Sequence, residues 1–122
     1  MIKDRLTIEE SEELINLGIP WHYATILRTE VPARSCGFRD VHFFTLANLL
    51  VLIPKVIKIE NKEYLFILQT LSENLNTGLW ISGYVNAERN INPNFKSEQP
   101  IDAITQVVKW CLEKGYLKFD KE

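Results

Sequence analysis

One extended stretch of the sequence is apolar on both of its faces. The segment Glu63–Leu71 directs two sets of large side chains to opposite sides: Tyr64, Phe66 and Leu68 to one side, and Leu65, Ile67 and Leu71 to the other. A strand with this pattern is typical of a sheet that is covered on both sides. The chain is therefore expected to build a sheet around this segment and to bring other elements onto its faces.

The neighbouring segments supply partner strands for this stretch. Val56–Glu60 alternates apolar and charged residues, and Asn61 with Lys62 suits a two-residue turn because Asn tolerates a positive φ. Gly78–Asn86 predicts the third strand, with Leu79, Ile81 and Val85 on one face and Trp80, Ser82 and Tyr84 on the other. Together they predict an antiparallel meander.

Helix signals flank the meander. Thr7 and Glu10 have the spacing of a capping box, and Gly18 is placed to end the helix that they open. Thr45 begins a second helix that stops before Pro54; it is apolar on nearly every side, so we expect it to be buried. Pro100 suits the first position of a last helix, which carries a half-circumference apolar stripe.

The remaining segments complete a prediction of the fold. Residues 21–29 are rich in aromatic and β-branched side chains and predict a strand. Residues 31–40 and the Asn-rich segment 87–99 predict loops. The expected fold class is α+β: a single domain over residues 1–122, in which an antiparallel meander of about three to four strands packs with about three helices.

Composition limits the classes of function. The 14 basic and 16 acidic residues give a net charge of −2, which argues against a dedicated nucleic-acid-binding protein. Residues 28–62 are locally basic, with Arg28, Arg34, Arg39, Lys55, Lys58 and Lys62 against three acidic residues, but the charges are interleaved, as on a solvated surface. The N-terminal sequence has no apolar core of a signal peptide, and no apolar run approaches the length of a membrane span. A cytoplasmic location without membrane contact is therefore expected.

Several motifs resemble those of a known group of proteins. The segment Phe44–Lys55 reads Phe-Thr-Leu-Ala-Asn-Leu-Leu-Val-Leu-Ile-Pro-Lys, and the last predicted helix ends in Trp110-Cys-Leu-Glu-Lys-Gly-Tyr116. With Tyr64-Leu65, and with Trp80 and Tyr84, these segments resemble small uncharacterised proteins of Bacteroides-type phages and mobile elements that carry Phe-Thr-Leu-x-Asp-Leu-Leu-x-x-Leu-Pro-Lys. Asn48 departs from the Asp of that pattern, which weakens an acidic cap. The resemblance implies a small α+β domain in a phage or mobile-element context, and it brings no catalytic residues with it.

The candidates for catalysis and metal binding are few. Cys36 lies six residues before His42 in a predicted loop, so a thiol and its base could be neighbours there. Cys111 falls on the apolar stripe of the last helix and is expected to be a buried small side chain. The spacings between His22, Cys36, His42 and Cys111 fit no zinc pattern. We therefore predict no catalytic residue, no metal site and no cofactor, and a cysteine-dependent enzyme using Cys36 and His42 stays an alternative.

The sheet face supplies the candidate partner surface. If the helices all cover one face of the sheet, the other face exposes either the aromatic set Tyr64, Phe66, Trp80 and Tyr84, or the opposite set of aliphatic residues. We take the aromatic set as the candidate, because aromatic side chains are the usual interface anchors. The same rings would offer a stacking platform to a nucleic-acid accessory protein, the second alternative, which the net charge disfavours. The favoured function is a small non-enzymatic protein-interaction domain whose partner is another protein or a second copy of itself, bound through this face or the 87–99 segment.

Overall fold

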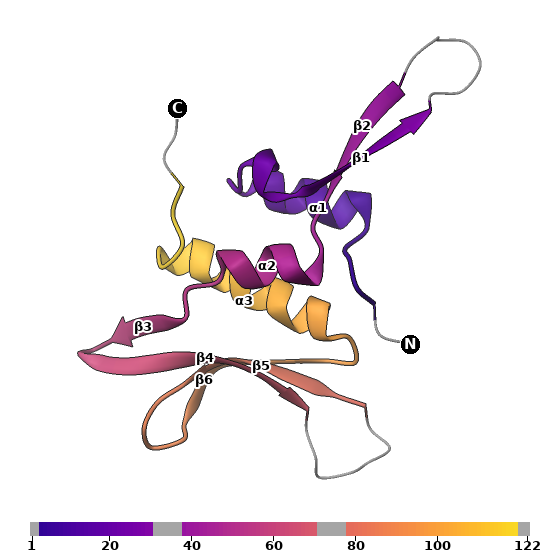
Figure 1. Ribbon diagram of the computed structural model, residues 1–122. Coiled ribbons are helices and arrows are strands. Elements are labelled where there is room, and N and C mark those ends of the chain that lie inside the picture. Colours follow the sequence, from indigo (N-terminus) through magenta and orange to yellow (C-terminus); the bar gives the residue numbers. More distant parts are fainter. Residues whose placement is uncertain (1–2, 31–37, 71–77, 120–122) are drawn as a thin grey trace.

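A four-stranded antiparallel sheet forms the base of the fold (Figure 1). Its strands lie in chain order: β3 (Val56–Ile59), β4 (Lys62–Thr70), β5 (Trp80–Val85) and β6 (Ile91–Ser97). The computed structural model describes residues 3–30, 38–70 and 78–119. Within them a second sheet pairs β1 (Thr25–Glu30) with β2 (Phe38–Phe43) as an arm that points away from the larger sheet (Figure 1).

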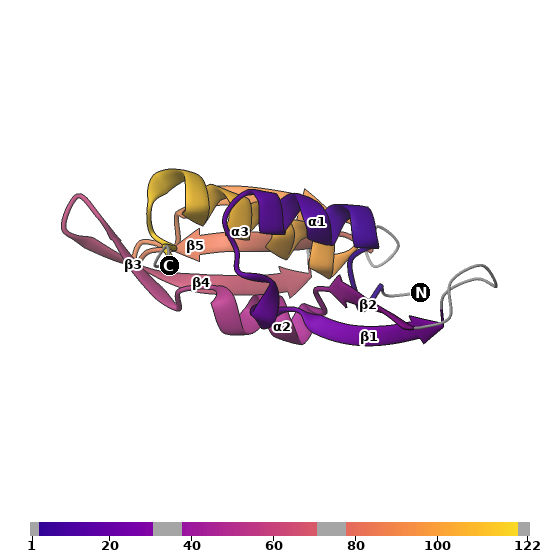
Figure 2. The same cartoon turned by 90° about the horizontal axis from the view of Figure 1, so that it is seen from above.

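The helices lie on one side of the larger sheet. α3 (Pro100–Lys114) crosses β5 and β6, and α2 (Leu46–Leu52) packs beside α3. α1 (Ile8–Asn16) lies on the far side of these two helices, next to β2 (Figures 1 and 2). The predicted α+β class with an antiparallel meander is therefore confirmed. None of the helices in the described part of the chain is long and apolar enough to cross a membrane.

Local capping explains where α1 begins and ends. The Thr7 hydroxyl accepts a hydrogen bond from the Glu10 amide (3.1 Å), and the Glu10 carboxylate accepts one from the Thr7 amide (3.0 Å). At the other end Gly18 takes a φ of +118°, and the Ile19 amide donates to the Leu14 carbonyl (3.2 Å). Both signals were readable in the sequence and both are confirmed.

α2 is capped in the same way, with Asn48 in place of an acid. The Thr45 amide donates to the Asn48 side-chain oxygen (2.9 Å), and the Asn48 amide donates to the Thr45 hydroxyl (3.1 Å). The amide side chain therefore completes the box that an Asp would complete. Phe44 and Leu49 are fully buried, but Val51 is 79% exposed. The prediction of a buried helix therefore holds for the side with Leu49 and is wrong for the side with Val51.

Two segments predicted as loops contain strands. Phe38–Asp40 belongs to β2, where it pairs with the end of β1, and Ile91–Ser97 forms the edge strand β6. In both cases the segment is extended because it hydrogen-bonds to a partner strand, and its own sequence has no strand pattern. The predicted strand over 21–29 begins only at Thr25, because Trp21–Tyr23 form a 3₁₀ turn after Pro20.

The core lies between the sheet and the helices. Its fully buried members come mainly from the three helices and from the segments that enter them: Leu14, Ile19, Phe44, Leu49, Ile101, Ile104, Val107, Val108 and Cys111. From the sheet, Ile57 and Tyr84 join this core, with Tyr64, Phe66, Leu68 and Phe95 packed against it. The face of the sheet that carries these residues is called the inner face below, and the opposite face is called the outer face.

Candidate functional site

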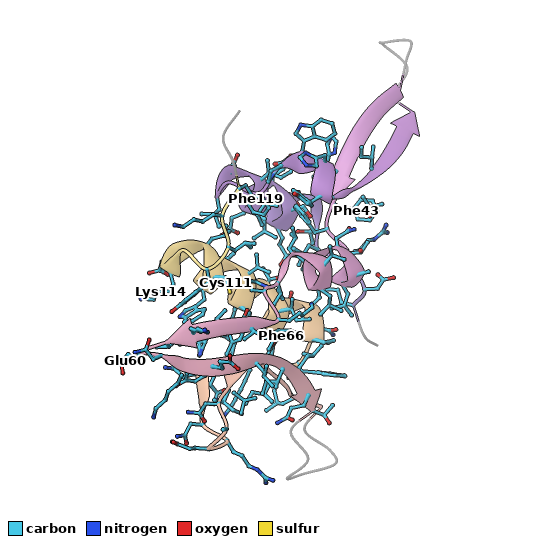
Figure 3. All side chains as sticks on the ribbon, turned by 60° about the vertical axis from the view of Figure 1, so that its left-hand side comes forward. Phe43, Glu60, Phe66, Cys111, Lys114 and Phe119 are labelled. Atoms are coloured by element: carbon cyan, nitrogen blue, oxygen red, sulfur yellow. The ribbon has the colours of Figure 1, made fainter. Side chains whose placement is uncertain are left out.

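The aromatic set predicted as a partner surface lies on the inner face. Tyr84 is 0% exposed, and its ring centre is 5.9 Å from that of Trp110 on α3. Phe66 is half-buried at 6.0 Å from Tyr84, on the side of the sheet where Cys111 lies (Figure 3). Tyr64 and Trp80 are half-buried and share this face by strand alternation. The core therefore includes Tyr84, and Tyr64 and Phe66 pack against it. The set does not form a freely exposed partner surface or stacking platform.

The same contacts make the Cys111 thiol unreactive. The Tyr84 hydroxyl donates to the Pro54 carbonyl (2.7 Å), and the Cys111 thiol lies 3.4 Å from the hydroxyl oxygen. Burial raises the pKa of the Cys111 thiol, and the weaker opposing effect of Tyr84 does not reverse this. A buried thiol with a raised pKa holds its proton and is a poor nucleophile. The prediction of a buried Cys111 is confirmed.

His42 lies in a chain of rings at the base of the arm. Its ring centre is 5.1 Å from that of Trp21, and Trp21 in turn contacts His22. The Nδ1 atom of His42 is enclosed and finds no hydrogen-bond partner in the described part of the chain. Cys36 lies outside the described residues, so the pairing of Cys36 with His42 stays a prediction. Among residues 3–30, 38–70 and 78–119, no three His, Cys, Asp or Glu side chains gather as a metal site would require.

The outer face carries the apolar set that the sequence left as the alternative. The strand registers pair Val56 with Leu65, Leu65 with Val85, and Val85 with Ile91, so these four side chains form one row across all four strands. Leu65 is 54% exposed and Val56 is 49% exposed, while Val85 and Ile91 are half-buried. Ile67 lies two residues along β4 on the same face. We call these five residues the outer patch: Val56, Leu65, Ile67, Val85 and Ile91.

The two halves of the outer face differ in how far they are filled. On the β5–β6 side, the backbone of β6 comes over Gly83 so closely that a Cβ there would lie 1.8 Å from the Pro93 carbonyl oxygen. The Ile91 side chain also lies against this position, at 3.4 Å. On the β3–β4 side Val56 and Leu65 stand exposed. The accessible part of the outer patch is therefore its β3–β4 half.

Charged residues border the exposed half. Lys58 on β3 and Glu63 on β4 are register partners and form the next outward-facing row after Val56 and Leu65. Both are exposed. On the other side of the patch, Gln69 and Lys96 flank Ile81, which is buried between them. An apolar centre with a polar rim of both signs is the usual make-up of a protein interface.

The two faces of the sheet differ in their side chains and in whether helices cover them. The inner residues are mainly aromatic and meet Trp110 and Cys111, whereas the outer residues are aliphatic and smaller. Alternation in the sequence defined both sets, but it contains no information on which set the helices would cover. In the described part of the chain, the helices all lie on the inner side (Figure 1).

Comparisons of the chain with protein-family models, with curated proteins and with solved structures found no match.

Proposed function

We propose that this chain is a small non-enzymatic protein-interaction domain that binds its partner through the outer patch. The observation that carries the proposal is the pair of large aliphatic side chains, Leu65 and Val56, exposed by about half at the centre of an apolar row. Contiguous apolar surface of this kind costs free energy in water, and burying it against a partner recovers that cost. The proposed partner surface thus lies on the outer face, whereas the sequence analysis had chosen the aromatic residues, which lie on the inner face.

The proposal includes a biological setting. The resemblance of the motifs at Phe44–Lys55 and Trp110–Tyr116 to small proteins of Bacteroides-type phages and mobile elements supports a phage or mobile-element origin. It also supports a partner from the phage or its bacterial host, met in the cytoplasm. A Bacteroides lysate is therefore the natural source of partners.

The test compares two variants in which the changed leucine has nearly the same exposed fraction, 54% for Leu65 and 51% for Leu17. Leu65→Lys places a charge in the outer patch, and Leu17→Lys places one at the end of α1, where Leu17 is 51% exposed. Tagged wild-type protein and both variants are used to capture proteins from lysate with and without nuclease treatment, and the bound proteins are identified by mass spectrometry. We expect the wild-type protein and Leu17→Lys to retain the same protein in near-equal amount, and Leu65→Lys to lose it.

Two outcomes would contradict the proposal. Retention by Leu65→Lys as strong as by the wild-type protein would remove the outer patch as the binding surface. A set of captured proteins that disappears on nuclease treatment would favour the nucleic-acid accessory function instead.

A further inference from the structure

We infer that the occupant of the outer patch is a second copy of this chain, an inference that rests on the proposed function. Its basis is the arrangement of four side chains on β3 and β4. Val56 and Leu65 are register partners, and so are Lys58 and Glu63 in the next outward-facing row. The exposed half of the outer patch is therefore a rectangle with two apolar corners and two oppositely charged corners.

This rectangle is complementary to itself under one two-fold rotation. The axis lies above the outer face, parallel to the strands and midway between β3 and β4. A rotation about it packs the two outer faces together and brings β3 of one copy over β4 of the other. Val56 then meets Leu65 of the second copy, and Lys58 meets Glu63 of the second copy. Because the interface is symmetric, each contact occurs twice. One operation thus buries all four exposed aliphatic side chains and pairs all four charges.

The rotation also avoids the filled half of the face. With the axis between β3 and β4, the second copy extends outward past β3 and away from the position where the Pro93 backbone covers Gly83. The overlap is two strands wide and as long as the four-residue strand β3, so it covers roughly 10 Å by 13 Å. This is less than the roughly 800 Å² per partner of a standard stable interface, so the expected dimer is weak, with a dissociation constant in the micromolar range.

The first measurement is the oligomeric state by sedimentation velocity. We expect the wild-type protein and Leu17→Lys to be dimers at roughly 0.1 mM, where a micromolar dimer is well populated. Leu65→Lys removes a central apolar contact twice, and we expect it to weaken the dimer by at least about 30-fold. Circular dichroism of each variant establishes that it is folded.

A charge-complementation experiment tests the proposed axis itself. Lys58→Glu gives a chain with two acids at these corners, and Glu63→Lys gives a chain with two bases. Each variant alone faces like charges across the axis, and we expect its dimer to weaken by about tenfold. When the two variants are mixed, every contact between the copies is again between opposite charges, and we expect a dimer with one chain of each kind. Pairing within a chain stays unfavourable in both variants, so a rescue reports only contacts between chains.

A matched pair controls for general electrostatic attraction. Lys62 and Glu88 form an exposed ion pair of 3.7 Å outside the outer patch. Lys62→Glu and Glu88→Lys change the same net charges, and we expect each to dimerise like the wild-type protein, with no gain on mixing. Equal gains from both pairs would overturn the proposed axis.

The outcomes separate this inference from the proposed function. A wild-type chain that is monomeric at roughly 0.1 mM would overturn the self-association. If that monomer still captured a lysate protein in a Leu65-dependent manner, the proposed function would stand while the homodimer fell. If neither binding nor dimerisation depended on Leu65, both would fall.

Discussion

Tyr84 shows how one residue fixes the orientation of the whole sheet. Its ring fills the space under Trp110, and its hydroxyl donates to the carbonyl of Pro54, which ends α2. The hydroxyl is also near the Cys111 thiol of α3. A single side chain of β5 therefore joins the sheet to two helices, and the residues on either side of it in β5 are directed to the outer face.

The environment of Tyr84 and Cys111 predicts a loss of stability at high pH. Burial is the largest cause that raises the pKa of the Tyr84 phenol, with the Cys111 contact adding to it, and burial also raises the pKa of the Cys111 thiol. Their usual values are 10.0 and 9.0. Above pH 9 the unfolded chain releases these protons while the folded chain retains them. The unfolded state then binds fewer protons, so the free energy of unfolding falls as the pH rises.

Urea titrations between about pH 8 and pH 11 measure this effect, which starts near the ordinary thiol pKa and steepens near the ordinary phenol pKa. Tyr84→Phe removes the contribution of the phenol. We expect this variant to be less stable by about 1 kcal/mol at neutral pH, because it loses the hydrogen bond to Pro54. Its decline above pH 10 should be shallower than that of the wild-type protein. An identical slope in the two proteins would contradict the assignment.

At the scale of elements, the sequence predicts best those features that depend only on residues close together in the chain, such as helix ends. The capping box at Thr7 and the start of α2 at Thr45 are local, and each is present as predicted. β6 was missed because its Asn-rich sequence gains its strand geometry from pairing with β5. For a similar reason, the sequence did not show that Tyr84 of the candidate surface is buried. Alternation defines two faces in the sequence, and only the packing of α3 decides which one remains exposed.

The cap of α2 gives a prediction at this scale. Thr45→Ala removes the hydroxyl that accepts from the Asn48 amide, and we expect the free energy of unfolding to fall by about 1 kcal/mol. Val51→Ala, at an exposed position of the same helix, is the control and should change stability by less than about 0.5 kcal/mol. Chemical denaturation of both variants measures the difference. Equal stabilities would show that the packing of Phe44 and Leu49, and not the cap, determines where α2 begins.

At the scale of the molecule, the two sheets differ in how many other elements pack against them. The four-stranded sheet is backed by α3 and α2, and β4 and β5 each have a strand on both sides. The arm of β1 and β2 has no further strand within the described residues (Figure 1). It contacts the body where β2 lies against α1, and where the Thr25 hydroxyl of β1 donates to the Asn48 side chain of α2 (2.8 Å). A two-stranded sheet has little stability of its own in water. The body and the arm should therefore open with different free energies.

Hydrogen exchange of the backbone amides tests this division. We expect the amides that join β4 to β5 to exchange only through global unfolding, because they are central and lie against the buried Tyr84. The amides that join β1 to β2 should open locally and exchange at least about a hundredfold faster, which corresponds to an opening free energy lower by about 3 kcal/mol. The amides of α3 serve as the internal reference for global unfolding, since that helix is buried along its whole inner stripe. Exchange of the β1–β2 amides as slow as that of α3 would mean that the arm is held by contacts beyond those with α1 and Asn48.

Since exchange can be repeated above and below the dissociation constant of the proposed dimer, the same data also report on the outer patch. The amides of the edge strand β3 should gain protection only at the higher concentration, while those of the arm stay unchanged.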